Sequence, residues 1–206
     1  MQIFHDDRDY RSFISLLGIA LQEFEIRCWN YCLMPNHFHA TLQPTASNLS
    51  EAIRYLNGVY AQRWNKQHNH VGHVFQGRFK DQIVQRDGYL VSLCRYIARN
   101  PVRANLVSSP EAWEWSSYAA TIGLRQAPSF LTVASTLEQF GPGDEGLLQA
   151  RFRDFVCGDP DEVMEERFRS NERIIGDLLF KKALRPLVEP DQPVSVPQAA
   201  SYVMEA

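Results

Sequence analysis

The segment YCLMPNHFHATLQP, residues 31–44, constrains the fold strongly, because polar and apolar side chains alternate along its second half. In a β-strand, successive side chains point to opposite faces of the sheet. The alternation therefore separates His37, His39 and Thr41 from Phe38, Ala40 and Leu42. Residues 25–33 are rich in aromatic and branched side chains, so the turn at 34–36 predicts a hairpin of two strands. We expect the apolar face to pack on helices and the histidine face to stay uncovered.

The patterns around this hairpin alternate between helix and strand. Apolar residues at helical spacing and N-terminal charge or capping signals predict the helices, and a branched, aromatic run predicts the third strand. The expected elements are helices over 6–24, 49–67 and 87–100, the last capped by Asp87 and ended by Pro101, and a third strand over 78–85. This order predicts an α+β fold, a ferredoxin-like antiparallel sheet with helices on one face.

The rest of the chain has a different character. After about residue 125 the pattern becomes helical, over 144–157 and 161–185, and the end of the chain is rich in proline. We therefore expect a first domain over 1–125, a helical C-terminal segment over 126–185 and a disordered tail over 186–206.

The charge is unevenly distributed along the chain. The net charge is −3, yet the stretch from Arg54 to Arg103 contains nine basic and two acidic residues. A basic centre in an acidic chain suits an anionic partner held at one place. A solvated charged face is the simpler explanation, but aromatic residues and glycines interrupt this stretch, which favours a binding surface.

Cysteine usage and hydropathy indicate the compartment. The four cysteines are scattered and form no Cys-x-x-Cys pair, which favours reduced thiols over a zinc ribbon or a disulfide framework. No apolar run approaches the ~20 residues of a membrane span, and the chain does not open on a secretory leader. These features predict a cytosolic protein.

The His37-x-His39 pair is a candidate metal site. Two neighbouring imidazoles can share one divalent cation at ~2.0–2.2 Å per bond, although two ligands alone hold it weakly. The alternative is that one histidine is a surface residue and the other hydrogen-bonds to a neighbour. For an isolated His-x-His this alternative is the commoner case, so the metal interpretation requires a third ligand.

The helix GYLVSLCRYIARN offers that ligand. Its core stripe is Leu90, Leu93, Cys94 and Ile97. Tyr96 and Asn100 lie one turn apart, together on the shoulder of this stripe. Asn100 would offer a carbonyl oxygen to a hard cation, and the Tyr96 phenol can act as a nucleophile. Taken alone, Tyr96 can be a half-buried aromatic residue and Asn100 the last helical residue before a proline. Neither explanation accounts for why the two residues share a helix face within the basic region.

Four segments together resemble a known family. YCLMPNHFHATLQP, GHVFQGRFK, YLVSLCRYIARNPVRANLV and WEWSSY are similar, in this order, to the REP-associated tyrosine transposases, which belong to the single-tyrosine HUH transposases of bacterial insertion sequences. The resemblance covers about residues 1–125. Four separate segments in the family's order are much more specific than any one motif.

The resemblance implies the HUH nuclease fold and an enzyme that nicks and rejoins single-stranded or hairpin DNA. It implies a metal site of His37, His39 and Asn100 for Mg²⁺ or Mn²⁺, and Tyr96 as the nucleophile that forms a 5′-phosphotyrosine link. Relatives carry a further strand ahead of the first helix, so the first strand of this fold is expected to be missing here. The chain after residue 125 matches only loosely.

The basic centre supplies the expected DNA contacts. The candidates are Gln76, Arg78, Lys80, Arg99 and Arg103. Basic side chains bind the phosphate backbone, and aromatic side chains stack on unpaired bases. Trp64, Phe75 and Phe79 are the aromatic candidates, although each is individually more typical of a core position.

Two other functions remain open on the sequence. The first is a truncated or domesticated relative that binds hairpin DNA without cutting it. The second is a metal-dependent hydrolase that uses water, which would need more acidic ligands near the histidines than the chain offers. In the preferred interpretation the partner is single-stranded or hairpin DNA, and the sequence is compatible with a homodimer. The expected location is the bacterial cytoplasm, in association with the nucleoid.

Overall fold

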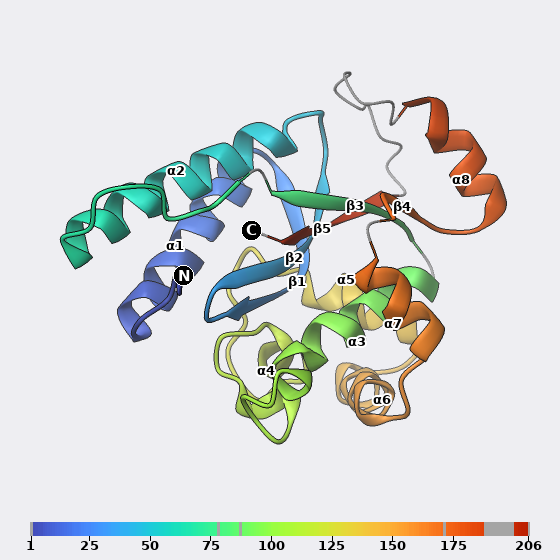
Figure 1. The fold of residues 1–206 in the computed structure, drawn as a ribbon. Helices are drawn as coiled ribbons and strands as arrows, with labels where there is room; N and C mark the ends of the chain where they lie inside the picture. Colours follow the sequence, from blue (N-terminus) through green and yellow to red (C-terminus); the bar gives the residue numbers. More distant parts are fainter. Residues whose placement is uncertain (1, 78, 87, 171, 188–199, 206) are drawn as a thin grey trace.

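A computed structural model describes residues 2–77, 79–86, 88–170, 172–187 and 200–205 (Figure 1). The helices are α1 (Asp7–Glu23), α2 (Leu49–His68), α3 (Gly88–Arg103), α4 (Tyr118–Thr121), α5 (Val133–Leu137), α6 (Glu145–Cys157), α7 (Glu162–Arg169) and α8 (Leu178–Leu184). The strands are β1 (Ile26–Met34), β2 (His37–Pro44), β3 (Lys80–Gln85), β4 (Ile174–Ile175) and β5 (Ala200–Glu205). Short 3₁₀ turns lie at Pro110–Ala112, Glu138–Phe140 and Arg185–Leu187.

These strands form one sheet in the order β1-β2-β5-β3-β4. The predicted hairpin is confirmed: β1 and β2 are antiparallel, with Met34 opposite His37 and a bulge near Cys28. Strand β5 pairs antiparallel with both β2 and β3, whereas β3 and β4 are parallel. The α+β class is therefore confirmed, with β2 inside the sheet.

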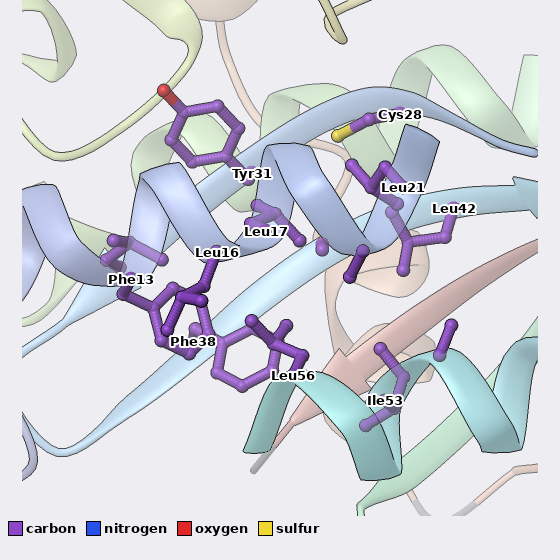
Figure 2. Close-up of a cluster of buried hydrophobic side chains, with 14 of the residues drawn as sticks. Phe13, Leu16, Leu17, Leu21, Cys28, Tyr31, Phe38, Leu42, Ile53 and Leu56 are labelled. Atoms are coloured by element: carbon purple, nitrogen blue, oxygen red, sulfur yellow. The ribbon is translucent and has the colours of Figure 1, made fainter. Parts of the chain in front are cut away.

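Helices cover both faces of the sheet. On one face, Phe13 of α1 and Leu56 of α2 belong to the same buried cluster as Phe38 and Leu42 of β2 (Figure 2). On the other face, residues of α3 pack with side chains of β1 and β3: Leu93 and Ile97 with Cys32 and Val84. The expectation of helices on one face is thus corrected, because the apolar stripe of α3 is buried against the face that α1 and α2 leave open.

Local signals explain where α1 begins and where α2 ends. The Asp6 side chain caps α1 by accepting hydrogen bonds from the backbone N–H groups of Arg8 and Asp9. Asn69 ends α2 in the left-handed conformation, with φ of 49°, which asparagine tolerates better than most residues. Both helices bury one apolar stripe on the sheet, as their spacing predicted.

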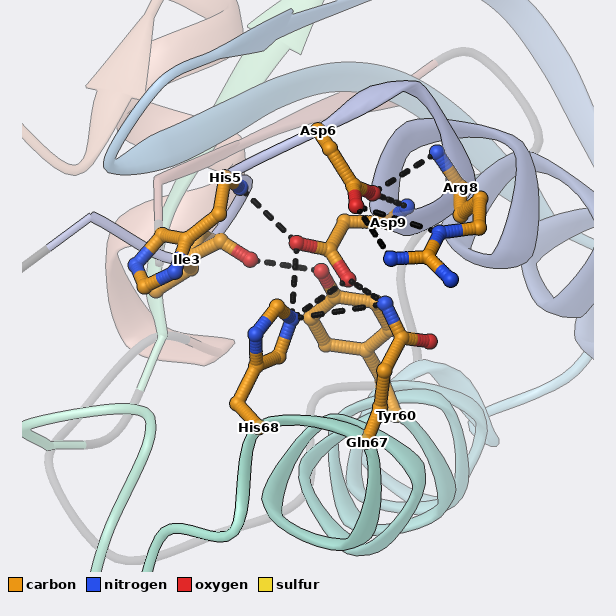
Figure 3. A network of polar contacts seen from close by, with 8 residues as sticks. All are labelled: Ile3, His5, Asp6, Arg8, Asp9, Tyr60, Gln67 and His68. Atoms are coloured by element: carbon orange, nitrogen blue, oxygen red, sulfur yellow. Dashed lines mark hydrogen bonds and ion pairs between the residues drawn. The ribbon is translucent and has the colours of Figure 1, made fainter.

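A polar network ties the start of the chain to the end of α2 (Figure 3). The buried Asp9 carboxylate accepts from the His5 backbone N–H at 2.8 Å, from Gln67 Nε2 at 3.1 Å and lies 3.0 Å from His68 Nε2. Tyr60 donates to the Ile3 carbonyl at 2.6 Å. Because a buried charge needs such partners, we interpret this network as structural.

Helix α3 does not stop before Pro101 as predicted but continues to Arg103. A proline late in a helix removes only one backbone hydrogen bond, and the turn is held by Ala104 N–H to the Asn100 carbonyl at 2.9 Å. The continuation has a consequence for the site, because it places Arg103 one turn beyond Asn100. The predicted cap, Asp87, lies outside the described residues.

The C-terminal part differs from expectation in two places. The helix predicted over 161–185 is divided into α7 and α8 by β4, whose Ile174 and Ile175 pair with Ile83 and Val84 of β3. The tail was expected to be disordered, but residues 200–205 form β5, which corrects that expectation for these six residues. Residues 188–199 lie outside the described part of the chain.

Two smaller expectations concern cysteines and membranes. All four cysteines are free thiols; Cys28, Cys32 and Cys94 are buried, and Cys157 is exposed. Among the helices that the structure describes, none has both the length and the apolar character that a bilayer crossing requires.

We predict that β5 holds the two halves of the sheet together, since β2 and β3 pair with β5 between them. Deleting the residues after Leu187 should lower the free energy of unfolding by at least about 2 kcal/mol, because several backbone hydrogen bonds at about 1 kcal/mol each are lost. Hydrogen exchange should accelerate at the amides of β2 and β3.

Two substitutions at one position of β5 refine this test. Val203 lies opposite Thr41 on one side and Gln82 on the other. Val203→Pro removes a backbone donor and should reproduce the faster exchange, whereas Val203→Ala retains it. Equal protection in the full-length and shortened proteins would show that β5 does not pair in solution.

Candidate active site

The two histidines of β2 lie side by side on the face that α3 covers. Their Nε2 atoms are 3.0 Å apart, and the rings meet edge to face with centroids 4.8 Å apart. His37 is partly exposed, and its Nδ1 lies 2.8 Å from Asn36 Oδ1. His39 is buried. The strand alternation is thus confirmed, since Phe38 faces the opposite side of the sheet, but the histidine face is not open as expected.

Burial keeps His39 uncharged. Desolvation, with smaller contributions from the nearby His37 and from the positive charge of Arg103, lowers the pKa of His39 from 6.5 to about 3. The imidazole is therefore neutral at physiological pH. A neutral imidazole is the form that binds a metal ion, so the environment of His39 favours a ligand role.

Tyr96 lies against this pair from α3. The rings of Tyr96 and His39 are 6.3 Å apart, centroid to centroid, at 84°. Tyr96 is only 3% exposed, so the shoulder of the apolar stripe, where the helical wheel placed it, is buried in the structure. Phe168 of α7 covers it, with ring centroids 5.4 Å apart. The structure thus brings together the predicted nucleophile and the histidines, beneath a helix that was not part of the prediction.

Asn100 is buried one turn beyond Tyr96, and Arg103 connects the two. Arg103 Nη2 donates to Asn100 Oδ1 at 2.6 Å, and the Arg103 guanidinium carbon lies 4.0 Å from the centre of the Tyr96 ring. Arg103 Nη1 also donates to Glu165 Oε2 of α7 at 3.3 Å. The predicted ligand oxygen of Asn100 is therefore engaged by a guanidinium in this conformation.

The arginines of α3 make internal contacts with the C-terminal segment. Arg99 Nη1 donates to the carbonyls of Val156 and Gly158, both at 3.0 Å. Arg95, likewise, donates to the Asp159 carbonyl at 3.0 Å. Arg99 and Arg103, which were predicted to contact DNA, thus have partners in the folded chain that the sequence did not reveal.

The other predicted DNA contacts are placed differently. Gln76 and Lys80 are exposed, and Arg78 lies outside the described residues. Val203 of β5 pairs with Thr41 of β2 on one side and with Gln82 of β3 on the other. Both strands run antiparallel to β5, so they run parallel to each other. His39 and Lys80, each two residues before these partners, therefore lie at the same level of the sheet. Side chains two apart along a strand share a face. Lys80 is therefore an exposed, predicted basic residue on the histidine side of the sheet.

The aromatic candidates are core residues to different degrees. Trp64 is buried, packed between His5, His68 and His70. Phe75 and Phe79 are partly buried against the same cluster. A base-stacking role for Trp64 would require the core to open, so its burial argues against that role.

The histidine pair fits a divalent cation in both chemistry and spacing. Two ligands at adjacent corners of an octahedron, with bonds of about 2.1 Å, have their donor atoms about 3.0 Å apart. The two Nε2 atoms have this spacing in the structure, where they form a hydrogen bond with each other. Imidazoles with an amide oxygen suit Mn²⁺ better than Mg²⁺, which prefers oxygen ligands. Within the described residues no three His, Cys, Asp or Glu side chains gather as a metal site, so a third protein ligand would have to be of another type, as Asn100 is.

Sequence reasoning missed Glu165 and Phe168. Both lie on α7, more than sixty residues beyond Tyr96, and both are buried. Their spacing of three residues indicates one helical face, but nothing in the sequence indicates which surface that face contacts.

Comparison with known proteins gives one finding. The comparisons with curated proteins and with solved structures give no match. Residues 1–100 match the family model described as "Transposase IS200 like", and this segment contains His37, His39, Tyr96 and Asn100. The matched residues thus include the whole predicted catalytic and metal-binding set, and the match supports the transposase family for this chain.

Proposed function

We propose that this protein is a transposase of the REP-associated tyrosine type, which nicks and rejoins single-stranded or hairpin DNA. The observation that carries the proposal is the approach of Tyr96 to His39, with ring centroids 6.3 Å apart. These residues come from different elements, α3 and β2, and both lie in the segment that matches the IS200-like transposases.

The roles follow from the chemistry of each side chain. His37, His39 and Asn100 would hold a divalent cation, Mn²⁺ or Mg²⁺, which when bound would polarise the scissile phosphate. His39 is suited to this role because it is neutral. Asn100 would take part once its oxygen is released by Arg103.

Tyr96 would act as the nucleophile. Its phenolic oxygen forms a bond to phosphorus while the bond between phosphorus and the 3′-oxygen breaks. The phenol loses its proton, the leaving 3′-oxygen gains one, and the 5′-phosphate stays on the tyrosine. Attack by another 3′-hydroxyl reverses these bond changes and rejoins DNA without an external energy source. Because a free phenol has a pKa near 10, the site must activate it.

DNA would approach from the side of the sheet that carries His37 and Lys80. His37 is partly exposed and Lys80 is exposed, so both are accessible from the surface. Gln76 lies nearby in the chain and is exposed as well. We place the phosphate contacts at these residues, and Arg99 and Arg103 would join them only by leaving their present partners.

A second candidate is supported by the burial of Tyr96. This residue is 3% exposed beneath Phe168, and Arg103 holds the oxygen of Asn100. A protein fixed in this conformation would bind hairpin DNA through its basic surface without cutting it. The two functions differ in one observable, a covalent tyrosine–DNA adduct. In either case we propose a location in the bacterial cytoplasm, associated with the nucleoid, and a homodimer remains compatible with both.

The nucleophile is tested by Tyr96→Phe, which removes the hydroxyl and retains the ring. Cleavage of hairpin oligonucleotides with Mn²⁺ and the covalent adduct, detected by denaturing gel and mass spectrometry, should both disappear. The thermal midpoint should change by no more than a few degrees, since the packing against His39 and Phe168 is retained.

Tyr89→Phe is the matched control, because Tyr89 lies two turns earlier on the same helix. It should cut like the unmodified protein. Cleavage by Tyr96→Phe would assign the attack to water or another residue. A complete lack of adduct in the unmodified protein, with hairpin binding intact, would favour the non-catalytic candidate.

The proposed phosphate contact at Lys80 predicts a change in salt dependence. The logarithm of the association constant for hairpin DNA should fall linearly with the logarithm of salt concentration, and Lys80→Ala should reduce that slope by about one unit. Fluorescence anisotropy from 50 to 300 mM salt measures it. Lys182→Ala, at an exposed lysine of α8, should leave the slope unchanged, and an equal effect of both variants would argue against a contact at Lys80.

A further inference from the structure

The site extends beyond the matched segment through one ion pair. Glu165 of α7 accepts from Arg103 Nη1 at 3.3 Å, and the two side chains are only 10% and 26% exposed. A partly buried ion pair costs desolvation energy and is weak evidence of a stabilising role. In addition, Glu165 Oε1 is buried without a hydrogen-bond partner among the described residues. A buried polar atom without a partner is uncommon and requires an explanation.

Arg103 contacts Glu165 and also two central residues of the site, Asn100 and Tyr96. One guanidinium nitrogen is held by Glu165, another donates to Asn100 Oδ1 at 2.6 Å, and the group lies over the Tyr96 ring at 4.0 Å. A guanidinium is planar and rigid, so fixing one edge of it fixes the others. Phe168, one turn beyond Glu165 on α7, contacts the same tyrosine ring.

Arg103 also brings a positive charge close to the histidines. Its guanidinium carbon lies 4.0 Å from the centre of the Tyr96 ring, and that ring lies 6.3 Å from the His39 ring, centroid to centroid. A divalent cation at the histidine pair would be repelled by the same charge. Glu165 is the carboxylate that the structure pairs with Arg103, and it offsets part of this repulsion.

Attachment of the C-terminal helices does not depend on this pair alone. Arg95 and Arg99 hold the end of α6 and the following turn through backbone carbonyls, without any carboxylate. Glu165 therefore differs from the other contacts between α3 and the C-terminal segment, because its partner touches the site.

We propose that Glu165 is a positioning residue of this site: it fixes the Arg103 guanidinium, which holds Asn100 and covers the Tyr96 ring, and it balances the charge of Arg103 beside a bound cation. The inference rests on the proposed function for the identity of the site. It gives the C-terminal segment a role in the chemistry of a site whose predicted nucleophile and metal ligands lie on α3 and β2.

The first test measures Mn²⁺ binding to the full-length protein without DNA, by the electron paramagnetic resonance of free Mn²⁺. Glu165→Gln retains size and hydrogen bonding but leaves the charge of Arg103 unbalanced, so it should raise the dissociation constant about tenfold, the lower end of the range for groups that support metal ligands. Glu172→Gln is the matched control, since Glu172 pairs with Arg167 and Lys181 on the same segment. It should bind within twofold of the unmodified protein, and His37→Ala should abolish binding.

A second variant keeps the test decisive if Glu165→Gln folds poorly. Arg103→Gln removes the repelling charge and releases Asn100, so it should bind Mn²⁺ several-fold more tightly than the unmodified protein. In the double variant Glu165→Gln/Arg103→Gln, the loss caused by Glu165→Gln should disappear, because the charge that Glu165 balances is gone. A tenfold loss that persists in the double variant would mean that Glu165 does not act through Arg103.

A metal-free readout separates this inference from the proposed function. In protein labelled with ¹³C at the tyrosine ring, the Tyr96 signal, assigned with Tyr96→Phe, should shift in Glu165→Gln and remain in place in Glu172→Gln. Absence of Mn²⁺ binding by the unmodified protein would overturn the metal site of the proposed function. An unmoved Tyr96 signal, or Mn²⁺ binding by Glu165→Gln within twofold of the unmodified protein, would overturn the positioning role.

Discussion

Strand β2 is buried on both faces, and the two faces have opposite chemical character. Phe38, Ala40 and Leu42 are fully buried toward α1 and α2, whereas His39 and Thr41 are buried toward α3. A shift of one residue in the β1–β2 register would exchange these faces and place imidazoles in the apolar core. The register of one hairpin therefore determines both the core of the protein and the location of its candidate site.

Helix α3 has to satisfy several requirements at once. Its apolar stripe covers the sheet, Tyr96 and Asn100 meet the histidine side of β2, and its arginines hold the C-terminal helices. Arg95, Arg99 and Arg103 thus stabilise contacts within the chain, so the part of the basic centre that lies on α3 is engaged by the fold. The exposed Lys80, level with His39 across β5, remains available beside the site.

The sheet depends on residues from both ends of the chain. Strands β2 and β3, from the first half, are joined by β5, whose residues lie more than one hundred positions later. Such pairing has a high contact order and is expected to form late in folding. If β5 and α7 dock only in the final steps, then the candidate site is completed last.

Local sequence patterns determined much of this protein. Period-two alternation specified the hairpin and the shared face of His37 and His39, and helical spacing specified α1, α2 and the i, i+4 pair Tyr96 and Asn100. These are properties of neighbours in the chain, so geometry within one element is enough to predict them. The predicted set also lies within the segment that matches the transposase family.

Tertiary structure alone decided the rest. The side of the sheet that α3 covers, the burial of His39 and Tyr96, the insertion of β5 and the contacts of Glu165 all depend on which distant surfaces meet. The sequence shows that a helix has an apolar face or that an arginine is charged, but not what either contacts. Arg103 is an example: predicted to bind phosphate, it binds Asn100 and Glu165, because a partly buried guanidinium requires acceptors and the fold supplies these two.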